Sequence, residues 1–148
     1  MEFIMNTQDS VSLTGKLQIS LNGTVVQEVN NMVVTAGKGW IASRMQGVVN
    51  GVMTHMAVGT GTVAAAAANT TLGTELARQG LTTSGGVVAG AVITFASTFA
   101  AGVATGAITE AGVLNASSSG TLLARTVFGV INKGALDTMT ISWAVTIS

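Results

Sequence analysis

The C-terminal stretch Ala135-Leu-Asp-Thr-Met-Thr-Ile-Ser-Trp-Ala-Val-Thr-Ile-Ser148 alternates between bulky apolar residues and small, mostly hydroxyl-bearing ones. Its odd positions carry the apolar side chains, which are Met139, Ile141, Trp143, Val145 and Ile147. Because successive side chains of a β-strand leave opposite faces of a sheet, this pattern predicts a core strand with one apolar face. Such a strand has to be paired at its edges and covered by a further layer, which the earlier parts of the chain must supply.

A hairpin is predicted near the N-terminus. Residues 10–21 alternate between apolar and polar side chains, and the dipeptide Asn22-Gly23 separates them from a second strand-like run, 24–29. Asn-Gly suits a type I′ turn, which needs positive φ at both central residues. A strict two-residue turn would set Leu17 opposite Glu28 on the apolar face. A bulge or a longer loop would shift that register, and both alternatives stay open.

The remaining pattern predicts one helix among strands. The helix spans 36–46, with Thr35 as its N-cap, Gly47 at its end, and Trp40, Ile41 and Met45 on one side. Further strands are predicted at 32–35, 51–59, 87–99, 104–113 and 122–131. The fold class expected is mainly β, an antiparallel β-sandwich or jelly roll of about 7–8 strands with one short helix near residues 36–46. We expect residues 10–148 to form this single domain, after a flexible N-terminal arm of residues 1–9.

The amino-acid composition restricts the classes of partner and of chemical site that we expect for this chain. The chain has 148 residues, a net charge of zero and no cysteine, which excludes disulfides and thiolate metal sites. No basic run exists to bind phosphates, so we expect no nucleic acid partner. Charged residues make up 8% of the chain, compared with about 25% in ordinary soluble domains. This low charge indicates that much of the exterior is covered by neighbouring subunits or is made up of Ser, Thr, Asn and Gly, and we expect a homo-oligomer, a dimer or a trimer.

One uncharged stretch, 86–107, is long enough to cross a bilayer as a helix. It contains no leucine, however, and it includes Gly90, Thr94, Ser97 and Thr98. Its first half also alternates, with apolar residues such as Ile93 on one side. The pattern therefore favours a strand, and we expect no membrane partner.

Catalytic and cofactor motifs lack their usual context. The run Gly59-Thr-Gly-Thr-Val-Ala64 formally matches the dinucleotide-binding fingerprint, but it is not placed in a parallel βαβ unit, so it predicts a loop at a strand end. His55 is the single histidine and has no acidic residue close in sequence, which indicates packing or an interface. There is no G-x-S-x-G nucleophile elbow. We expect no enzyme activity, no catalytic residue, no cofactor and no metal site.

The carboxylates of Glu75 and Glu110 could be imagined as an acid/base pair for glycoside cleavage. That reaction needs a cleft rich in aromatic and polar groups, and the chain has four Phe, two Trp and no Tyr. A structural interpretation is favoured, in which Glu75 pairs with Arg78 and Glu110 pairs with an arginine such as Arg125 across strands or subunits. The structural or interface candidates are Trp40, His55, Glu75, Arg78, Glu110, Arg125 and Trp143.

Three blocks of the sequence resemble tailed-bacteriophage virion proteins. The first is 56–78, in which a strand ending in Val-Gly-Thr-Gly-Thr, a loop of small residues and a T-x-L-x-x-E-x-x-R element follow one another. The second is 99–112, and the third comprises 122–128 with 131–143. Together the resemblance covers roughly residues 33–148, whereas the N-terminal hairpin is less clearly part of it.

The resemblance implies a structural protein of the phage particle, assembled in the bacterial host cytoplasm. We expect a capsid decoration (cement) protein, with the major capsid protein and other virion proteins as partners besides the chain itself. The alternative is a tail-fibre, collar or head-fibre component involved in host attachment. A receptor-binding tip needs exposed aromatic residues, and only two tryptophans are present, which favours the cement hypothesis.

Overall fold

The computed structural model describes residues 9–47 and 51–148, and it places nine strands and one helix in these residues. In chain order the elements are β1 (Leu13–Leu21), β2 (Thr24–Val33), α1 (Thr35–Met45), β3 (His55–Gly59), β4 (Glu75–Gly80), β5 (Val87–Ala89), β6 (Val92–Phe99), β7 (Gly106–Leu114), β8 (Leu122–Lys133) and β9 (Met139–Ile147). The prediction of a mainly β chain with one short helix is confirmed.

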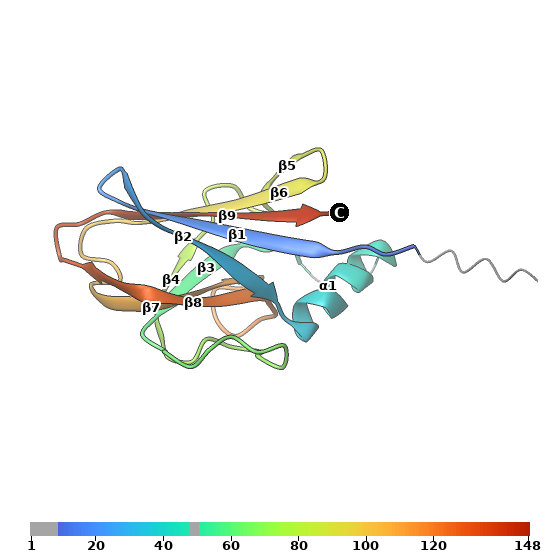
Figure 1. Ribbon diagram of the computed structural model, residues 1–148, viewed down its shortest axis with the longest axis horizontal. Coiled ribbons are helices and arrows are strands. Elements are labelled where there is room, and N and C mark those ends of the chain that lie inside the picture. Colours follow the sequence, from blue (N-terminus) through green and yellow to red (C-terminus); the bar gives the residue numbers. More distant parts are fainter. Residues whose placement is uncertain (1–8, 48–50) are drawn as a thin grey trace, which may run out of the picture.

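All nine strands belong to a single antiparallel sheet with the order β4-β3-β7-β8-β2-β1-β9-β6-β5. The sheet is curled into a half-barrel, so that one arm, β4-β3-β7-β8, faces the other arm, β1-β9-β6-β5, across the core (Figure 1). The prediction of a sandwich or jelly roll of about 7–8 strands is therefore wrong. The reason lies in β2, which pairs with β1 along most of its length and with β8 through Met32 and Val33. This single strand joins the two arms, and alternation in the sequence does not reveal such a shared strand.

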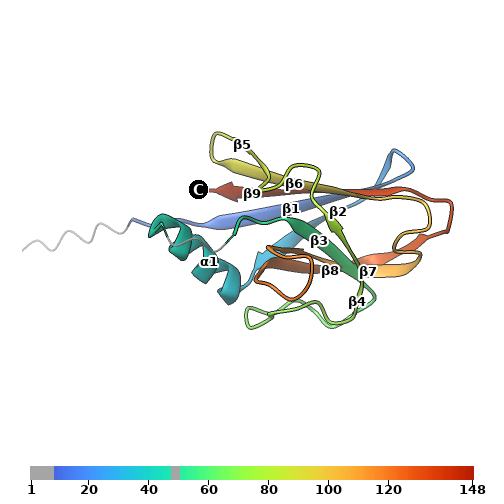
Figure 2. The ribbon, with the colours of Figure 1, turned by 180° about the vertical axis from the view of Figure 1, so that it is seen from behind.

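The far edges of the curled sheet also approach each other. The backbone N–H of Thr82 donates to the carbonyl oxygen of Ala96 at 2.8 Å. The Ser97 hydroxyl donates to the carbonyl oxygen of Gly80, at the end of β4, at 3.0 Å. These contacts connect β4 to β6, and the view from behind shows the two edges on the same side of the molecule (Figure 2).

Strand β9 forms the centre of the core, as its alternation predicted. Met139, Ile141 and Trp143 are fully buried, and Val145 is nearly so, whereas Ile147 at the end of the strand is 45% exposed. β9 is hydrogen-bonded to β1 on one edge and to β6 on the other. Its apolar row packs against buried residues of both arms, including Leu17, Ile19, Phe95, Phe99, Met56, Ile108 and Phe128.

The predicted N-terminal hairpin is also confirmed. Asn22 and Gly23 have φ values of 50° and 81°, as a type I′ turn requires. A bulge between Ile19 and Ser20 shifts the register, so that Leu17 lies opposite Val29. Of the two alternatives, the bulge is the one present, and it removes the conflict between an apolar residue and Glu28.

The helix differs from its prediction at the N-terminus. Its N-cap is Val34, and no side chain caps the helix, because Thr35 is already helical and its N–H donates to the carbonyl oxygen of Ala67. The helix ends as predicted, with Gly47 at a φ of 81°. Met45 is 87% exposed and, unlike Trp40 and Ile41, is not packed against the core.

Other predicted strands also differ from the observed ones. The run 32–35 is the end of β2, the run 87–99 is divided into β5 and β6 by a turn at Gly90, and β4 was not predicted as a strand. Within the described residues, no helix is both long and apolar enough to cross a membrane. The predicted arm, residues 1–9, lies outside the described residues except for Asp9, and the single domain 10–148 stays a prediction.

Candidate functional site

The most deeply buried charges lie on β7 and β8. Glu110 and Arg125 have side chains that are 0% and 2% exposed, and the Nη2 and Nε atoms of Arg125 donate to Oε2 of Glu110 at 2.8 and 3.0 Å. They form the ion pair that the sequence suggested, and it joins two strands of one chain. A buried pair of this kind needs every remaining lone pair satisfied, because both charges have lost their water.

The segment 60–74 supplies the remaining hydrogen bonds. The backbone N–H groups of Gly61 and Thr74 donate to Oε1 of Glu110 at 2.9 and 2.6 Å, and that of Gly73 donates to Oε2 at 2.8 Å. Arg125 in turn donates to Oδ1 of Asn69 and to the carbonyl oxygen of Val63. The ion pair therefore fastens this loop over the outer face of β7 and β8.

The glycines of the apparent dinucleotide motif have a different role. A Cβ atom on Gly61 would lie 2.4 Å from Oε1 of Glu110, and one on Gly59 would lie 2.2 Å from the carbonyl oxygen of Thr74. Only glycine permits these close approaches. The motif is thus explained by a loop packed around a carboxylate, in a sheet that is antiparallel throughout.

The environment of Glu110 fixes its ionisation. Burial alone would raise the pKa of this carboxyl, but the amides of Thr74 and Gly73, the Arg125 guanidinium and the Gly61 amide together hold the pKa below its ordinary value. Glu110 is therefore an anion with all its hydrogen-bonding capacity in use. Glu110 on β7 and Glu75 on β4 both lie opposite Gly59 of β3, on its two sides. Because Glu110 is fully buried, a sugar could not reach this pair of carboxylates.

The second predicted ion pair is present on β4. Arg78 donates through Nη2 and Nε to the two carboxylate oxygens of Glu75 at 2.6 and 3.1 Å. Its Nη1 donates to the carbonyl oxygens of Ala116 and Ser119 at 2.9 Å each. The pair is more exposed than the Glu110 pair, and it connects β4 to the loop between β7 and β8.

The remaining candidates lie apart from these pairs. His55 begins β3 and is half-buried, with Nδ1 2.7 Å from the hydroxyl of Thr54. Trp143 lies in the core, and its indole Nε1 has no hydrogen-bond partner within the described residues. Trp40 lies on α1 and donates through Nε1 to the carbonyl oxygen of Gly51 at 3.0 Å. An interface role for any of these residues stays a prediction.

A third polar cluster was missed by sequence reasoning. Lys133 is 1% exposed, and its ammonium donates to the carbonyl oxygens of Ala100 and Asp137 at 3.0 and 2.6 Å. The Asp137 carboxylate accepts from the Asn22 amide and from the Gly134 N–H, and these hydrogen bonds hold its pKa below the ordinary value. The one sequence feature that pointed to this cluster was the turn Gly134-Ala-Leu-Asp137. No local pattern reveals that this turn contacts the distant Asn22.

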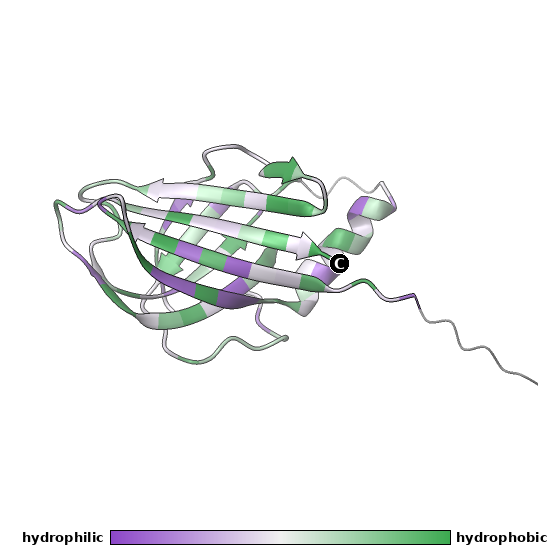
Figure 3. Cartoon of the chain, turned by 45° about the horizontal axis from the view of Figure 1, so that its top comes forward, coloured by the Kyte–Doolittle hydropathy of each residue, from purple (hydrophilic) through white to green (hydrophobic). Residues whose placement is uncertain are grey.

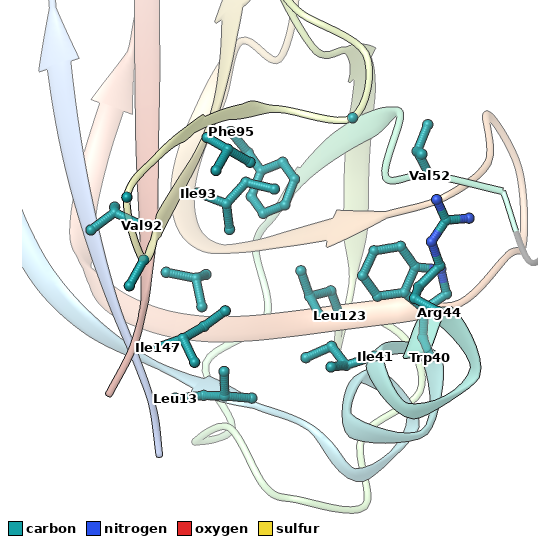
Figure 4. A pocket seen from close by; sticks show the side chains of 15 residues that line it. Leu13, Trp40, Ile41, Arg44, Val52, Val92, Ile93, Phe95, Leu123 and Ile147 are labelled. Atoms are coloured by element: carbon teal, nitrogen blue, oxygen red, sulfur yellow. The ribbon is translucent and has the colours of Figure 1, made fainter. Parts of the chain in front are cut away.

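The opposite end of the molecule carries an apolar surface, which we call the end face. A cavity of about 330 Å³ opens between α1, the β5–β6 hairpin and the ends of β1 and β9 (Figure 4). A second, of about 920 Å³, opens on the other side of β1. The two cavities share Leu13, Ile41 and Ile147. Most of their lining is apolar and includes Val11, Met32, Trp40, Met45, Val88, Val92 and Ile93. The smaller cavity also has Arg44 in its wall, and the larger one has Ser12, Asn31 and Lys38.

Among residues 9–47 and 51–148, no group of three or more His, Asp or Glu side chains is placed to hold a metal ion.

Comparison of the chain with known proteins gives no further indication of its function. No protein-family model, no characterised protein and no solved structure matches it significantly. The resemblance to tailed-bacteriophage virion proteins therefore stays a prediction.

Proposed function

We propose that the chain is a non-enzymatic structural protein of a tailed-phage particle, and specifically a capsid decoration protein that binds and stabilises the assembled head. The observation that carries the proposal is the distribution of polar and apolar groups. The buried charges of Glu110, Arg125 and Lys133 are used to fasten loops to the sheet. The end face, by contrast, leaves apolar side chains in solvent, and exposed apolar patches of this kind mark protein contacts.

The blocks that carry the phage resemblance meet at one place in the fold. Gly61 and Gly73 come from the first block, Glu110 from the second and Arg125 from the third, and all four take part in the buried cluster. The sequence features behind the resemblance therefore build a loop that is hydrogen-bonded to two buried side chains of the sheet. This supports a role in architecture, since the same residues are unavailable to a substrate.

A decoration protein would act by mass action. A subunit that binds the assembled shell and not its separated parts raises the free energy of disassembly, and the effect grows with the concentration of free subunit. Rigid loops suit this role, because a preorganised surface loses less conformational entropy on docking.

The proposal is tested on particles that contain the chain. Gold-labelled antibodies raised against the purified protein should mark the whole shell in electron micrographs. Particles stripped of the protein should release their genome at a lower temperature, and adding back the purified chain should restore the original temperature. Label confined to the tail would replace this proposal with the fibre or collar alternative. Particles without label would overturn both.

A further inference from the structure

The turn between β1 and β2 contains a dipeptide with chemistry of its own. In Asn22-Gly23, the backbone nitrogen of the glycine can attack the carboxamide carbon of the asparagine, because glycine has no Cβ to hinder the approach. Both residues are exposed. In Figure 3 the alternating hydrophilic and hydrophobic bands of β1 and β2 run toward this turn, at the end of the molecule away from the C-terminus.

The reaction in question is deamidation, and water is its only co-reactant. A bond forms between the Gly23 nitrogen and Cγ of Asn22, and the bond from Cγ to Nδ2 breaks. The proton lost by the Gly23 nitrogen leaves with Nδ2 as ammonia. Water then opens the cyclic imide at either of its carbonyl groups, which gives aspartate or isoaspartate at position 22.

Three hydrogen bonds hold Asn22 against the turn between β8 and β9, residues 134–138. The Asn22 N–H donates to the carbonyl oxygen of Thr138 at 2.8 Å, and the Thr138 N–H donates to Oδ1 of Asn22 at 2.9 Å. Nδ2 of Asn22 donates to Oδ1 of Asp137 at 2.8 Å. The Asp137 carboxylate is itself fixed by the Gly134 N–H. Both polar atoms of the reactive carboxamide are therefore occupied, one of them by a charge-assisted bond.

The conformation of the turn also keeps the reacting atoms apart. Asn22 and Gly23 have φ values of 50° and 81°. In the type I′ turn that these values indicate, ψ of the first central residue is about 30°. This ψ points the Gly23 nitrogen away from the Asn22 side chain, so the ring closes only after rotation about the Cα–C bond. The turn must open for that rotation, and the bonds to Thr138 and Asp137 oppose the opening.

We propose that Asn22 is a deamidation site, and that the 134–138 turn keeps this site closed in the native chain. The rate is then set by local opening of the two turns and not by unfolding of the sheet. Either product keeps the turns apart. Aspartate places a second carboxylate where Asp137 had accepted a hydrogen bond, and isoaspartate adds a carbon atom to the backbone of a two-residue turn.

The proposal goes beyond the proposed function, because it concerns the chemistry of the chain itself. It leaves the end face available to other proteins, since the end face lies at the opposite end of the molecule. It therefore stands or falls independently of where the chain is located in a phage particle.

Peptide mapping by mass spectrometry tests the proposal on the purified chain, incubated at neutral pH with and without urea. Folded Asp137→Ala should deamidate at Asn22 about tenfold faster than the folded wild type, because it lacks the charge-assisted bond. In urea the two chains should react at the same rate. The dipeptide Asn50-Gly51, whose Asn50 lies outside the described residues, is the internal reference in urea.

A matched variant separates local opening from global unfolding. Glu110→Gln weakens a distant buried ion pair and leaves all three bonds of Asn22 in place, so Asn22 should deamidate at the wild-type rate. Equal acceleration in Glu110→Gln and Asp137→Ala would overturn the proposal. A wild type that reacts as fast when folded as in urea would overturn it too. Circular dichroism verifies that each variant is folded before incubation.

The effect of the product is tested by Asn22→Asp, which copies one of the two products. This variant should lower the midpoint of thermal unfolding by about 2–4 °C, because it replaces a hydrogen bond to Asp137 with a contact between like charges. An unchanged midpoint would contradict the claim that the product keeps the two turns apart.

Discussion

At the scale of single residues, Glu110 shows how this chain tolerates a charge in its interior. Its two carboxylate oxygens accept five hydrogen bonds, three from backbone amides and two from Arg125. Charge-assisted hydrogen bonds of this kind compensate the lost hydration only as a complete set. Removing one partner leaves the other charge buried without compensation.

Glu110→Gln should therefore lower the free energy of unfolding by about 3–5 kcal/mol, because it leaves the Arg125 guanidinium unpaired in the interior. The matched control is Glu75→Gln, which disrupts the more exposed pair with Arg78 and should cost about 1 kcal/mol or less. Urea denaturation of the two variants measures the difference. Equal losses would show that burial of the first pair has no energetic consequence.

The same carboxylate should make stability depend on pH. Its pKa in the folded chain lies below the ordinary value of 4.5, so between these two values the unfolded chain binds more protons. The contribution of Glu110 is thus complete above about pH 4.5 and is lost as the pH falls through the folded pKa. The wild type should lose its advantage over Glu110→Gln as the pH falls below that point. A difference that is constant down to pH 2 would contradict this assignment.

At the scale of elements, α1 is positioned by the close contact of one glycine with β8. A Cβ atom on Gly37 would lie 2.1 Å from the carbonyl oxygen of Leu123, so the helix approaches the strand as closely as backbone allows. Gly39, in the same helix, has no atom within 4 Å of such a Cβ. The helix therefore contains two glycines with opposite physical roles.

Gly37→Ala should destabilise the protein by about 1–3 kcal/mol, because the methyl group forces α1 away from β8. Gly39→Ala should instead stabilise it by about 0.5–1 kcal/mol, since alanine loses less backbone entropy in a helix. Thermal unfolding followed by circular dichroism separates the two. A stabilising Gly37→Ala would mean that the helix does not rest on the strand.

Among the individual elements, the sequence predicted correctly those whose patterns depend on neighbouring residues. The alternation of residues 139–147 and the Asn22-Gly23 turn both depend on neighbouring residues, and both predictions are confirmed. Strand β4 was missed because Glu75–Gly80 has no clear alternation and is held by pairing with β3. The prediction that Thr35 is the N-cap was wrong, because Thr35 is already helical and its N–H donates to the carbonyl oxygen of the distant Ala67.

At the scale of the whole molecule, the two arms share one core. β2 connects them through only two residue pairs with β8, at Met32 and Val33. The side chains of β9 nevertheless pack against residues of both arms. Cooperativity should therefore come from the shared interior rather than from the hydrogen bonds between the arms.

We expect both arms to unfold in one transition. In a Trp40→Phe variant, Trp143 is the only tryptophan and reports the centre of the core, while far-ultraviolet circular dichroism reports all strands. The two signals should give the same midpoint and slope in urea, as a two-state transition requires. Two separate midpoints would show that the arms fold independently.

The sequence by itself determined the strand-rich class, the central apolar strand, the hairpin and the pairing of Glu75 with Arg78, because periodicity and short-range spacing set these features. It also made Glu110 and Arg125 plausible partners. Only the tertiary structure decided that β2 joins two arms into one curled sheet and that three amides enclose Glu110. These features depend on which distant segments come together, and that is settled by the packing of the whole chain.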